Sequence, residues 1–349
     1  MTMRIPLLRP GLPPLAALAP YIERIDASRM YSNFGPLVRE LEARLAARHG
    51  LPTTGLVTVT NATLGLTAAM AAQGAPAGSL CLMPAWTFIA SPLAALSARL
   101  TPFFLDVAAD WALHPELVEE ALPGLPGPVG AVMPVAPFGQ PIDPAGWDAF
   151  RARTGMAVVI DAAAGFDAAT PGTVPTVVSL HATKALGAGE GGYVMSHDTA
   201  LIRRVQTYSA FGFYGSRNAQ LPGFNAKMSE YSAAVALASL DRWETTRAAL
   251  VVRAAAYQAG FASSNLVQMQ PGFGDRWVAN TCVVGLPAGS AEAVTESLTE
   301  AGIESRAWWS DGAHRHRATE ALPRASLPRT ESLAAATLGL PFYTDMPEA

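Results

Sequence analysis

The sequence carries little charge and no surplus of basic residues. Only 15% of its 349 residues are Asp, Glu, Lys or Arg, and the formal net charge is −4. This balance excludes a basic surface able to hold nucleic acid or an anionic membrane, so we expect neither as a partner. Any anionic ligand must be bound locally, by a few well-placed groups.

Cysteines and long apolar runs are also scarce. Cys81 and Cys282 are too few and too isolated for a disulfide framework or a zinc site, and both stand in apolar, strand-like runs. We therefore expect buried thiols in a reducing compartment. The apolar N-terminus is interrupted by prolines, and no uninterrupted run is long enough to span a bilayer. These absences predict a cytoplasmic protein.

Half of the residues are hydrophobic, which at this length predicts a large domain over residues 1–245 and a smaller α+β domain over 246–349. In the first part, short apolar runs alternate with helical segments. This alternation predicts an α/β fold with a mostly parallel sheet, of a seven-stranded type, between helices. The strand-like runs are 56–59, 79–84, 98–107, 130–139, 157–165 and 177–183, and the clearest helical ones are 36–50, 114–122, 143–153 and 229–261.

Polar and aromatic side chains follow several of these strands. The turn 61–63 separates a strand from an alanine-rich helix, so its backbone N–H groups could cradle an anion, although Asn61 could equally be a simple helix N-cap. Trp86 and Phe88 follow the next strand, where aromatic rings serve either the core or a ligand platform. Ligands of parallel sheets bind at the carboxyl ends of the strands, so we expect these residues to lie together.

Two ionisable residues follow later strands. Asp161 ends an apolar run and precedes three alanines, and a buried carboxylate there requires a cation or a strong donor. Because no second carboxylate or histidine stands nearby at ligand spacing, a protonated ring nitrogen fits better than a metal. Lys184 lies between an apolar run and a glycine-rich turn. Partial desolvation there would lower its pKa and leave an amine able to form a Schiff base, although the segment alone also fits a solvated loop lysine.

A lysine amine, a buried carboxylate, an anion cradle and an aromatic face are the groups that pyridoxal 5′-phosphate (PLP) requires. Over nearly its whole length, the sequence resembles the DegT/DnrJ-type nucleotide-sugar aminotransferases, which are PLP-dependent transferases of fold type I. The most specific matching motifs are SLHATKALGAGEGGYV and FNAKMSEYSAAVALASLDR. The others are NATLGLTAAMAAQG, MPAWTFIASPLAAL, MPVAPFGQPID, VVIDAAAGFDA, GIESR and LPRTESLAAATLGLP.

The resemblance implies a role for each matching residue. Lys184 would bind the cofactor and later move the substrate proton, and Asp161 would keep the pyridine nitrogen protonated. Asn225 would reach the phosphate of a neighbouring subunit, which implies a homodimer with shared active sites. The remaining implied cofactor contacts are Ala62 through its backbone N–H, Thr63, Phe88 or less favourably Trp86 as the stacking aromatic, Ala163 under the opposite ring face, and Ser179.

The implied activity is transfer of an amino group, from L-glutamate, to a nucleotide-linked keto sugar in amino-sugar biosynthesis, for a surface polysaccharide or a glycosylated metabolite. A PLP-type sugar dehydratase is disfavoured, because such relatives carry histidine where this chain has Lys184. A PLP-binding regulator or scaffold without turnover is the second alternative. Neither fold nor cofactor residues indicate which sugar, carbon or nucleotide carrier is used.

The sequence departs from the family pattern at three places. Ala164 stands where relatives carry glutamine or histidine beside the phenolic oxygen of the cofactor, and Lys227 stands where they carry arginine. The sequence ends at MPEA, where relatives generally continue, so we expect a short or absent last helix in the small domain.

Other polar groups allow more than one interpretation. His181 could be a third catalytic residue in contact with the substrate, or a hydrogen-bonding residue of the wall, and Glu190 is expected to be structural in its turn. Residues 314–317 could meet a nucleotide diphosphate or form a solvated loop. The glycines of 187–192 do not form a dinucleotide loop, because a strand rather than a helix follows them.

Overall fold

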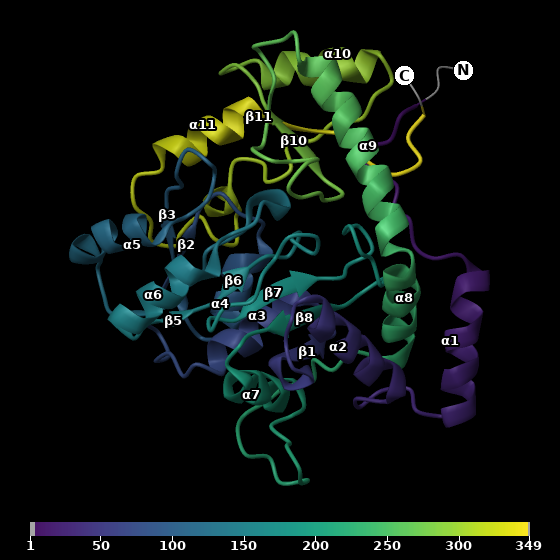
Figure 1. The fold of residues 1–349 in the computed structure, drawn as a ribbon. Helices are drawn as coiled ribbons and strands as arrows, with labels where there is room; N and C mark the ends of the chain where they lie inside the picture. Colours follow the sequence, from purple (N-terminus) through teal and green to yellow (C-terminus); the bar gives the residue numbers. More distant parts are fainter. Residues whose placement is uncertain (1–3, 348–349) are drawn as a thin grey trace.

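The computed structural model describes residues 4–347, and one continuous sheet is its central feature (Figure 1). Two four-stranded parts, β3-β2-β4-β5 and β6-β7-β8-β1, join where β5 (Ala157–Val158) and β6 (Ile160–Asp161) follow one another as halves of one strand. With these halves counted once, the sheet has seven strands, and only β8 runs antiparallel to its neighbours. The α/β fold with a mostly parallel sheet is thus confirmed. The other strands are β1 (Leu56–Val59), β2 (Leu80–Pro84), β3 (Thr101–Leu105), β4 (Val129–Val132), β7 (Thr176–Ser179) and β8 (Gly192–Met195).

Helices cover both faces of this sheet because successive strand residues point to opposite sides. Val57 and Val59 face a cluster made with α3 (Ala62–Ala71), α4 (Ala90–Ser97) and α7 (Thr199–Ser209). Leu56 faces the other cluster, to which the remaining helices of this part contribute. These are α2 (Pro36–Arg48), α5 (Pro115–Ala121), α6 (Pro144–Thr154) and α8 (Glu230–Asp241), with α1 (Leu15–Ser28) packed outside α8.

Helix α3 lies unusually close to the sheet. A Cβ added at Gly65 would meet methyl groups of Val177 and Val59 at 3.1 Å, so glycine gives the helix room here and a larger residue would require small shifts of these methyl groups. The helix begins at Asn61, whose Oδ1 accepts a hydrogen bond from the backbone N–H of Leu64 at 2.9 Å. The first amides of α3 therefore lie directly beside the ends of β7 and β8.

The C-terminal part begins where the predicted helix over 229–261 breaks at Arg242, between α8 and α9 (Trp243–Phe261). Helix α9 leads to a small antiparallel sheet of order β11-β10-β9 (Figure 1). Its elements are β9 (Gln268–Met269), β10 (Cys282–Gly285), α10 (Ala291–Glu300), α11 (Pro328–Ala336) and β11 (Thr337–Leu340). Ile5 pairs with Ile303, so the N-terminal segment also contacts this part, and the domain boundary near residue 245 stays a prediction.

A segment of the C-terminal part returns to the large sheet. The backbone of Phe104 in β3 donates to the carbonyl of Pro323 at 3.1 Å and accepts from the N–H of Ala325 at 2.9 Å. Asp106, just after β3, accepts hydrogen bonds from the amides of Arg329 and Thr330, each at 2.8 Å. These contacts fix the C-terminal residues over the strand ends.

Both cysteines are buried and form no disulfide, and burial raises the pKa of each thiol to about 12. Within residues 4–347, no helix combines the length and the apolar character needed to cross a membrane.

Candidate active site

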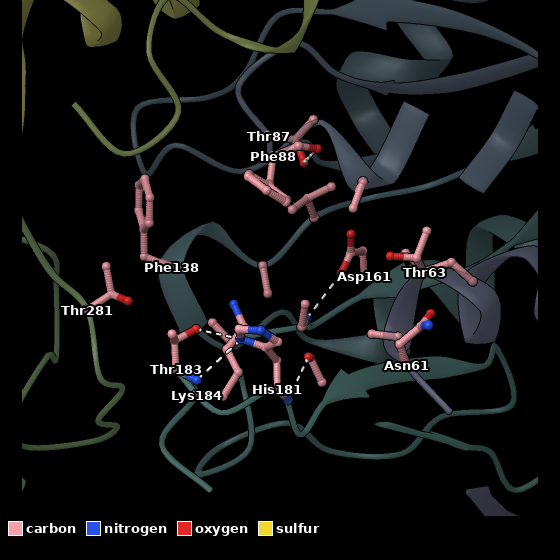
Figure 2. A pocket seen from close by; sticks show the side chains of 18 of the residues that line it. Asn61, Thr63, Thr87, Phe88, Phe138, Asp161, His181, Thr183, Lys184 and Thr281 are labelled. Atoms are coloured by element: carbon pink, nitrogen blue, oxygen red, sulfur yellow. Dashed lines mark hydrogen bonds between the residues drawn. The ribbon is translucent and has the colours of Figure 1, made fainter. Parts of the chain in front are cut away.

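A cavity of about 590 Å³ lies at the carboxyl ends of the parallel strands (Figure 2). Its walls come from the start of α3, the loops that follow β2, β4, β6 and β7, and three residues of the C-terminal part. The cavity brings together most of the predicted site residues. Those that line it are Ala62, Thr63, Phe88, Asp161, Ala163, Ser179, His181 and Lys184.

Lys184 lies in the turn between β7 and β8. Its backbone N–H donates to the carbonyl of His181 at 2.8 Å, and its own carbonyl accepts from the Asn280 side chain at 3.3 Å. The turn is thus held by a contact within itself and by a residue of the C-terminal part. Burial lowers the pKa of the Lys184 amine, and the negative charge of Asp161 partly opposes this. The neutral, nucleophilic form of the amine is therefore favoured more than in a solvated lysine.

Asp161 ends β6 and is almost fully buried, with 5% of its surface exposed. Ser91 Oγ donates to its Oδ2 at 2.8 Å, and the backbone N–H of Ala163 donates to its Oδ1 at 3.1 Å. Burial raises the pKa of the carboxyl group, while these two donors and the Lys184 charge act in the opposite direction. A cationic partner in the cavity would stabilise the carboxylate further, and the protonated pyridine nitrogen of PLP is such a partner.

The start of α3 forms the anion cradle. Asn61 is the N-cap, as one interpretation of the sequence had it, and its side chain bonds Leu64, so the amides of Ala62 and Thr63 remain for a ligand. A Cβ at Gly192 would lie 3.0 Å from the backbone nitrogen of Ala62, so glycine at this position keeps the cradle against the sheet. The cradle and the buried Asp161 carboxylate fit the two charged ends of PLP.

The structure distinguishes the two aromatic residues that were candidates for stacking on the cofactor. Phe88 is 57% exposed and lines the cavity, whereas Trp86 is 2% exposed and does not reach it. The Trp86 ring instead packs edge-on against Phe138 and Trp309, with ring centroids 6.2 and 5.3 Å apart. Trp86 is therefore a core residue behind the cavity wall, which corrects its place among the cofactor contacts.

Sequence reasoning missed the wall that faces the C-terminal part. Phe138, in the left-handed backbone region at φ 55°, stacks on Trp309 with ring centroids 3.9 Å apart. Trp308 and Thr281 complete this side of the cavity. The Pro-Phe-Gly turn around Phe138 was a usable signal, because such a turn can project an aromatic ring from a strand end.

His181 both lines the cavity and hydrogen-bonds within its wall. Its Nδ1 accepts from the backbone N–H of Thr183 at 3.3 Å and lies 2.9 Å from the Thr183 hydroxyl. The neutral ring therefore carries its proton on Nε2, which is 3.6 Å from a carboxylate oxygen of Glu190. Glu190 also lines the cavity, so it is more than the turn residue that the sequence indicated.

Two other sets of candidate residues do not line the cavity. Asn225 is exposed, does not line the cavity, and accepts a hydrogen bond from Lys227 Nζ at 2.6 Å. Residues 314–317 do not form one anion-binding face, because His314 is 1% exposed and Arg315 pairs with Glu331 at 2.9 Å. Among residues 4–347, no cluster of His, Cys, Asp or Glu side chains is arranged to hold a metal.

Fold and cavity together are those of a PLP-dependent transferase of fold type I. The chain belongs to the DegT/DnrJ/EryC1/StrS aminotransferase family, whose model matches residues 16–349. It is thus an aminotransferase, and PLP is its cofactor.

Named relatives share this assignment. The chain is 29% identical to dTDP-3-amino-3,4,6-trideoxy-alpha-D-glucose transaminase of Streptomyces venezuelae, across 90% of this chain and 85% of the relative. It superposes on the structure of DesI in the presence of its TDP-sugar product with a TM-score of 0.88 and 32% identity, covering 99% and 90% of the two chains. A structure from Bacillus cereus ATCC 10987, assigned as a PLP-dependent aminotransferase, gives a TM-score of 0.91 and 29% identity, covering 99% and 96%.

Proposed function

We propose that this protein transfers an amino group from L-glutamate to the keto group of a nucleotide-linked sugar, in amino-sugar biosynthesis. The observation that carries the proposal is the meeting of Lys184, Asp161 and the start of α3 around one cavity. The relatives support the acceptor class, since one is named as a dTDP-sugar transaminase and another has a structure described as in the presence of its TDP-sugar product.

Each residue of the cavity has a separate role in the proposed reaction. Bound PLP supplies an electron sink for the charge that develops when the substrate loses its α-proton. The Lys184 amine, with its pKa lowered by burial, would hold the cofactor and could then carry that proton. The Asp161 carboxylate would favour the protonated form of the ring nitrogen. The Ala62 amide, Thr63 and Ser179 would hold the phosphate, and Phe88 and Ala163, which also line the cavity, would pack against the ring.

The acceptor occupies the far end of the cavity. Figure 2 shows Phe138 and Thr281 on the opposite side of Lys184 from Asn61 and Thr63. The aromatic rings there offer flat apolar faces of the kind that pack against the C–H groups of a sugar. We assign His181 to a hydroxyl of the acceptor, because it lines the cavity and its Nε2 lies 3.6 Å from Glu190, beyond hydrogen-bonding distance.

A second copy of the chain completes the site. Among the described lining residues, Lys184 is the only lysine or arginine, which leaves a nucleotide diphosphate without a cation to bind it. Asn225 is exposed and outside the cavity of its own chain, as expected of a residue supplied to a partner. We therefore propose a cytoplasmic homodimer with shared sites, each chain divided into domains near residue 245.

Covalent mapping tests the lysine assignment directly, because the sequence contains just two lysines, Lys184 and Lys227. Borohydride reduction of the PLP-loaded protein should fix the pyridoxyl group on the Lys184 peptide. The Lys227→Arg variant should keep the label, and Lys184→Ala should lose it together with the visible absorption of the bound cofactor. A label on Lys227, or an active Lys184→Ala variant, contradicts the assignment.

Turnover is tested in two halves. L-Glutamate should convert the loaded protein to its pyridoxamine form, and a panel of UDP-, GDP- and dTDP-linked keto sugars should then return it to the PLP form. An unchanged spectrum with glutamate and with other amino acids would favour a PLP-binding regulator over an enzyme.

A further inference from the structure

A chain of hydroxyl groups connects the cavity wall to Asp161. Thr87 Oγ1 lies 2.7 Å from Ser91 Oγ, and Ser91 Oγ donates to Asp161 Oδ2 at 2.8 Å. Thr87, Ser91 and Asp161 are all buried, with exposed fractions of 0%, 0% and 5%. Because these groups are buried, they take their hydrogen-bond partners from the protein, and the only other contact of the Thr87 hydroxyl among the described residues is the carbonyl of Phe88 at 3.5 Å.

The direction of this chain follows from its proton count. Ser91 has one hydroxyl proton, and the carboxylate of Asp161 can only accept, so the Ser91 proton is directed to Asp161. The Ser91 oxygen is then the acceptor for the Thr87 hydroxyl. Both dipoles therefore point toward the carboxylate, an arrangement in which each hydrogen bond strengthens the other.

Asp161 has few alternatives to these donors. Its other oxygen accepts from the Ala163 amide at 3.1 Å, and the charged group that faces it from the cavity is Lys184. Because Lys184 is committed to the covalent chemistry of the site, Ser91 and the Ala163 amide are the permanent donors. Ser91 lies in the first turn of α4, so the positive end of that helix also faces the carboxylate.

We propose that Ser91 and Thr87 are positioning residues that hold Asp161 as a carboxylate, with its orientation fixed, so that the ring nitrogen of bound PLP stays protonated. This rests on the proposed role of Asp161. Thr87 also adjoins Phe88 in the chain, so the hydroxyl chain links the residue beside the ring face to the residue at the ring nitrogen. One short segment, 87–91, thus carries Phe88 and also the two hydroxyl groups that orient Asp161.

The test removes each hydroxyl in turn. Ser91→Ala deletes the donor to Asp161, and Thr87→Val deletes the second hydroxyl with almost no change in shape. Thr87→Ser restores the hydroxyl and is the rescue variant. Ser97→Ala is the matched control, since Ser97 lies in the same helix but donates to the carbonyl of Leu93 at 2.8 Å on an exposed face.

The primary measurement is the 15N chemical shift of the ring nitrogen in each variant loaded with labelled PLP. Without its donor, the Asp161 carboxylate becomes more basic and draws the shared proton from the ring. A hydrogen bond to a charged group corresponds to roughly tenfold in an equilibrium constant. We expect Ser91→Ala to move the 15N signal toward the unprotonated value and to lower kcat about tenfold, with little change in the KM for glutamate. Thr87→Val should shift both in the same direction by less.

Each outcome decides the proposal. Unchanged 15N shifts in Ser91→Ala and Thr87→Val would overturn it, even if activity or thermal stability fell, because such losses would show only a packing role. Equal shifts in Ser97→Ala, or no recovery in Thr87→Ser, would also overturn it. The shift is read in the loaded protein without turnover, so it is independent of whether glutamate or a keto sugar is the substrate.

Discussion

Replacing Gly192 by alanine is expected to weaken PLP binding while leaving the fold intact. The new Cβ would stand 2.9 Å from the carbonyl oxygen of Val178 and 3.0 Å from the backbone nitrogen of Ala62. Both atoms belong to the backbone, so neither can rotate away. Either strand β8 or the first turn of α3 must therefore move.

The position of Gly192 indicates which of the two moves. Strand β8 is hydrogen-bonded to β1 on one side and to β7 on the other, whereas the first amides of α3 have no partner within the helix. The helix start is the weaker side, and it is also the anion cradle. Overpacking of this kind costs about 1–3 kcal/mol, which corresponds to roughly a 5- to 150-fold loss of affinity if the cradle bears it all.

The assay compares PLP affinity with the free energy of unfolding in urea for the same variants. Gly127→Ala, where the new Cβ has no neighbour within 4 Å, should leave both unchanged. Gly65→Ala crowds the same helix, but against valine methyl groups that can adjust, so it should leave affinity near that of the wild type. If Gly192→Ala binds PLP as tightly as the wild type, the Ala62 amide is not a phosphate ligand, and the reasoning fails.

Three further substitutions test other parts of the structure. The fully buried Glu230 carboxylate accepts hydrogen bonds from the first two amides of α2, at 2.8 and 3.0 Å. Glu230→Gln should therefore lower the free energy of unfolding, measured by urea titration, by about 2–3 kcal/mol. A loss near zero would contradict the capping role of Glu230. Burial, aided by the Arg48 charge, lowers the pKa of His49 to about 4. Because the folded protein disfavours the protonated His49 ring, the free energy of unfolding should fall by about 2 kcal/mol between pH 7.5 and pH 5. His49→Gln should reduce this loss. Urea titrations at both pH values measure the difference. Asp106→Ala frees two amides at the start of α11, so limited proteolysis should cleave the C-terminal part faster, whereas an unchanged rate would show that other contacts hold it.

Alternating apolar and helical segments were enough to predict the large sheet, because burial on both faces leaves a strong pattern in each strand. Other elements have no such pattern. Helix α1 contains Pro20 and was not among the predicted helical segments, yet the helix forms against α8. Strand β11 needs glycine at position 339, because a Cβ there would collide with the Trp308 ring. This requirement comes from a tertiary contact, which the local sequence pattern does not reveal.

The sequence likewise predicted some residues of the candidate site and not others. The strand ends placed Asp161, Ser179 and Lys184 together, because the carboxyl ends of parallel strands share one edge of the sheet. The pattern could not separate Phe88 from Trp86, since both follow the same strand and only packing decides which ring is covered. It also could not find Trp309, which reaches the cavity from a segment more distant in the chain.

The return of residues 323–325 to β3 has a consequence for how the protein is made. Strand β3 lies at the edge of the large sheet, and an unpaired edge invites association with other chains. The residues that pair with this edge, Pro323 and Ala325, lie far downstream of β3 in the sequence, so a growing chain exposes the edge until that segment has been made. Pro323, which then lies beside the edge strand, has no backbone N–H to offer to another chain. The C-terminal segment thus protects the mature sheet from aggregation, and premature termination would leave that protection missing.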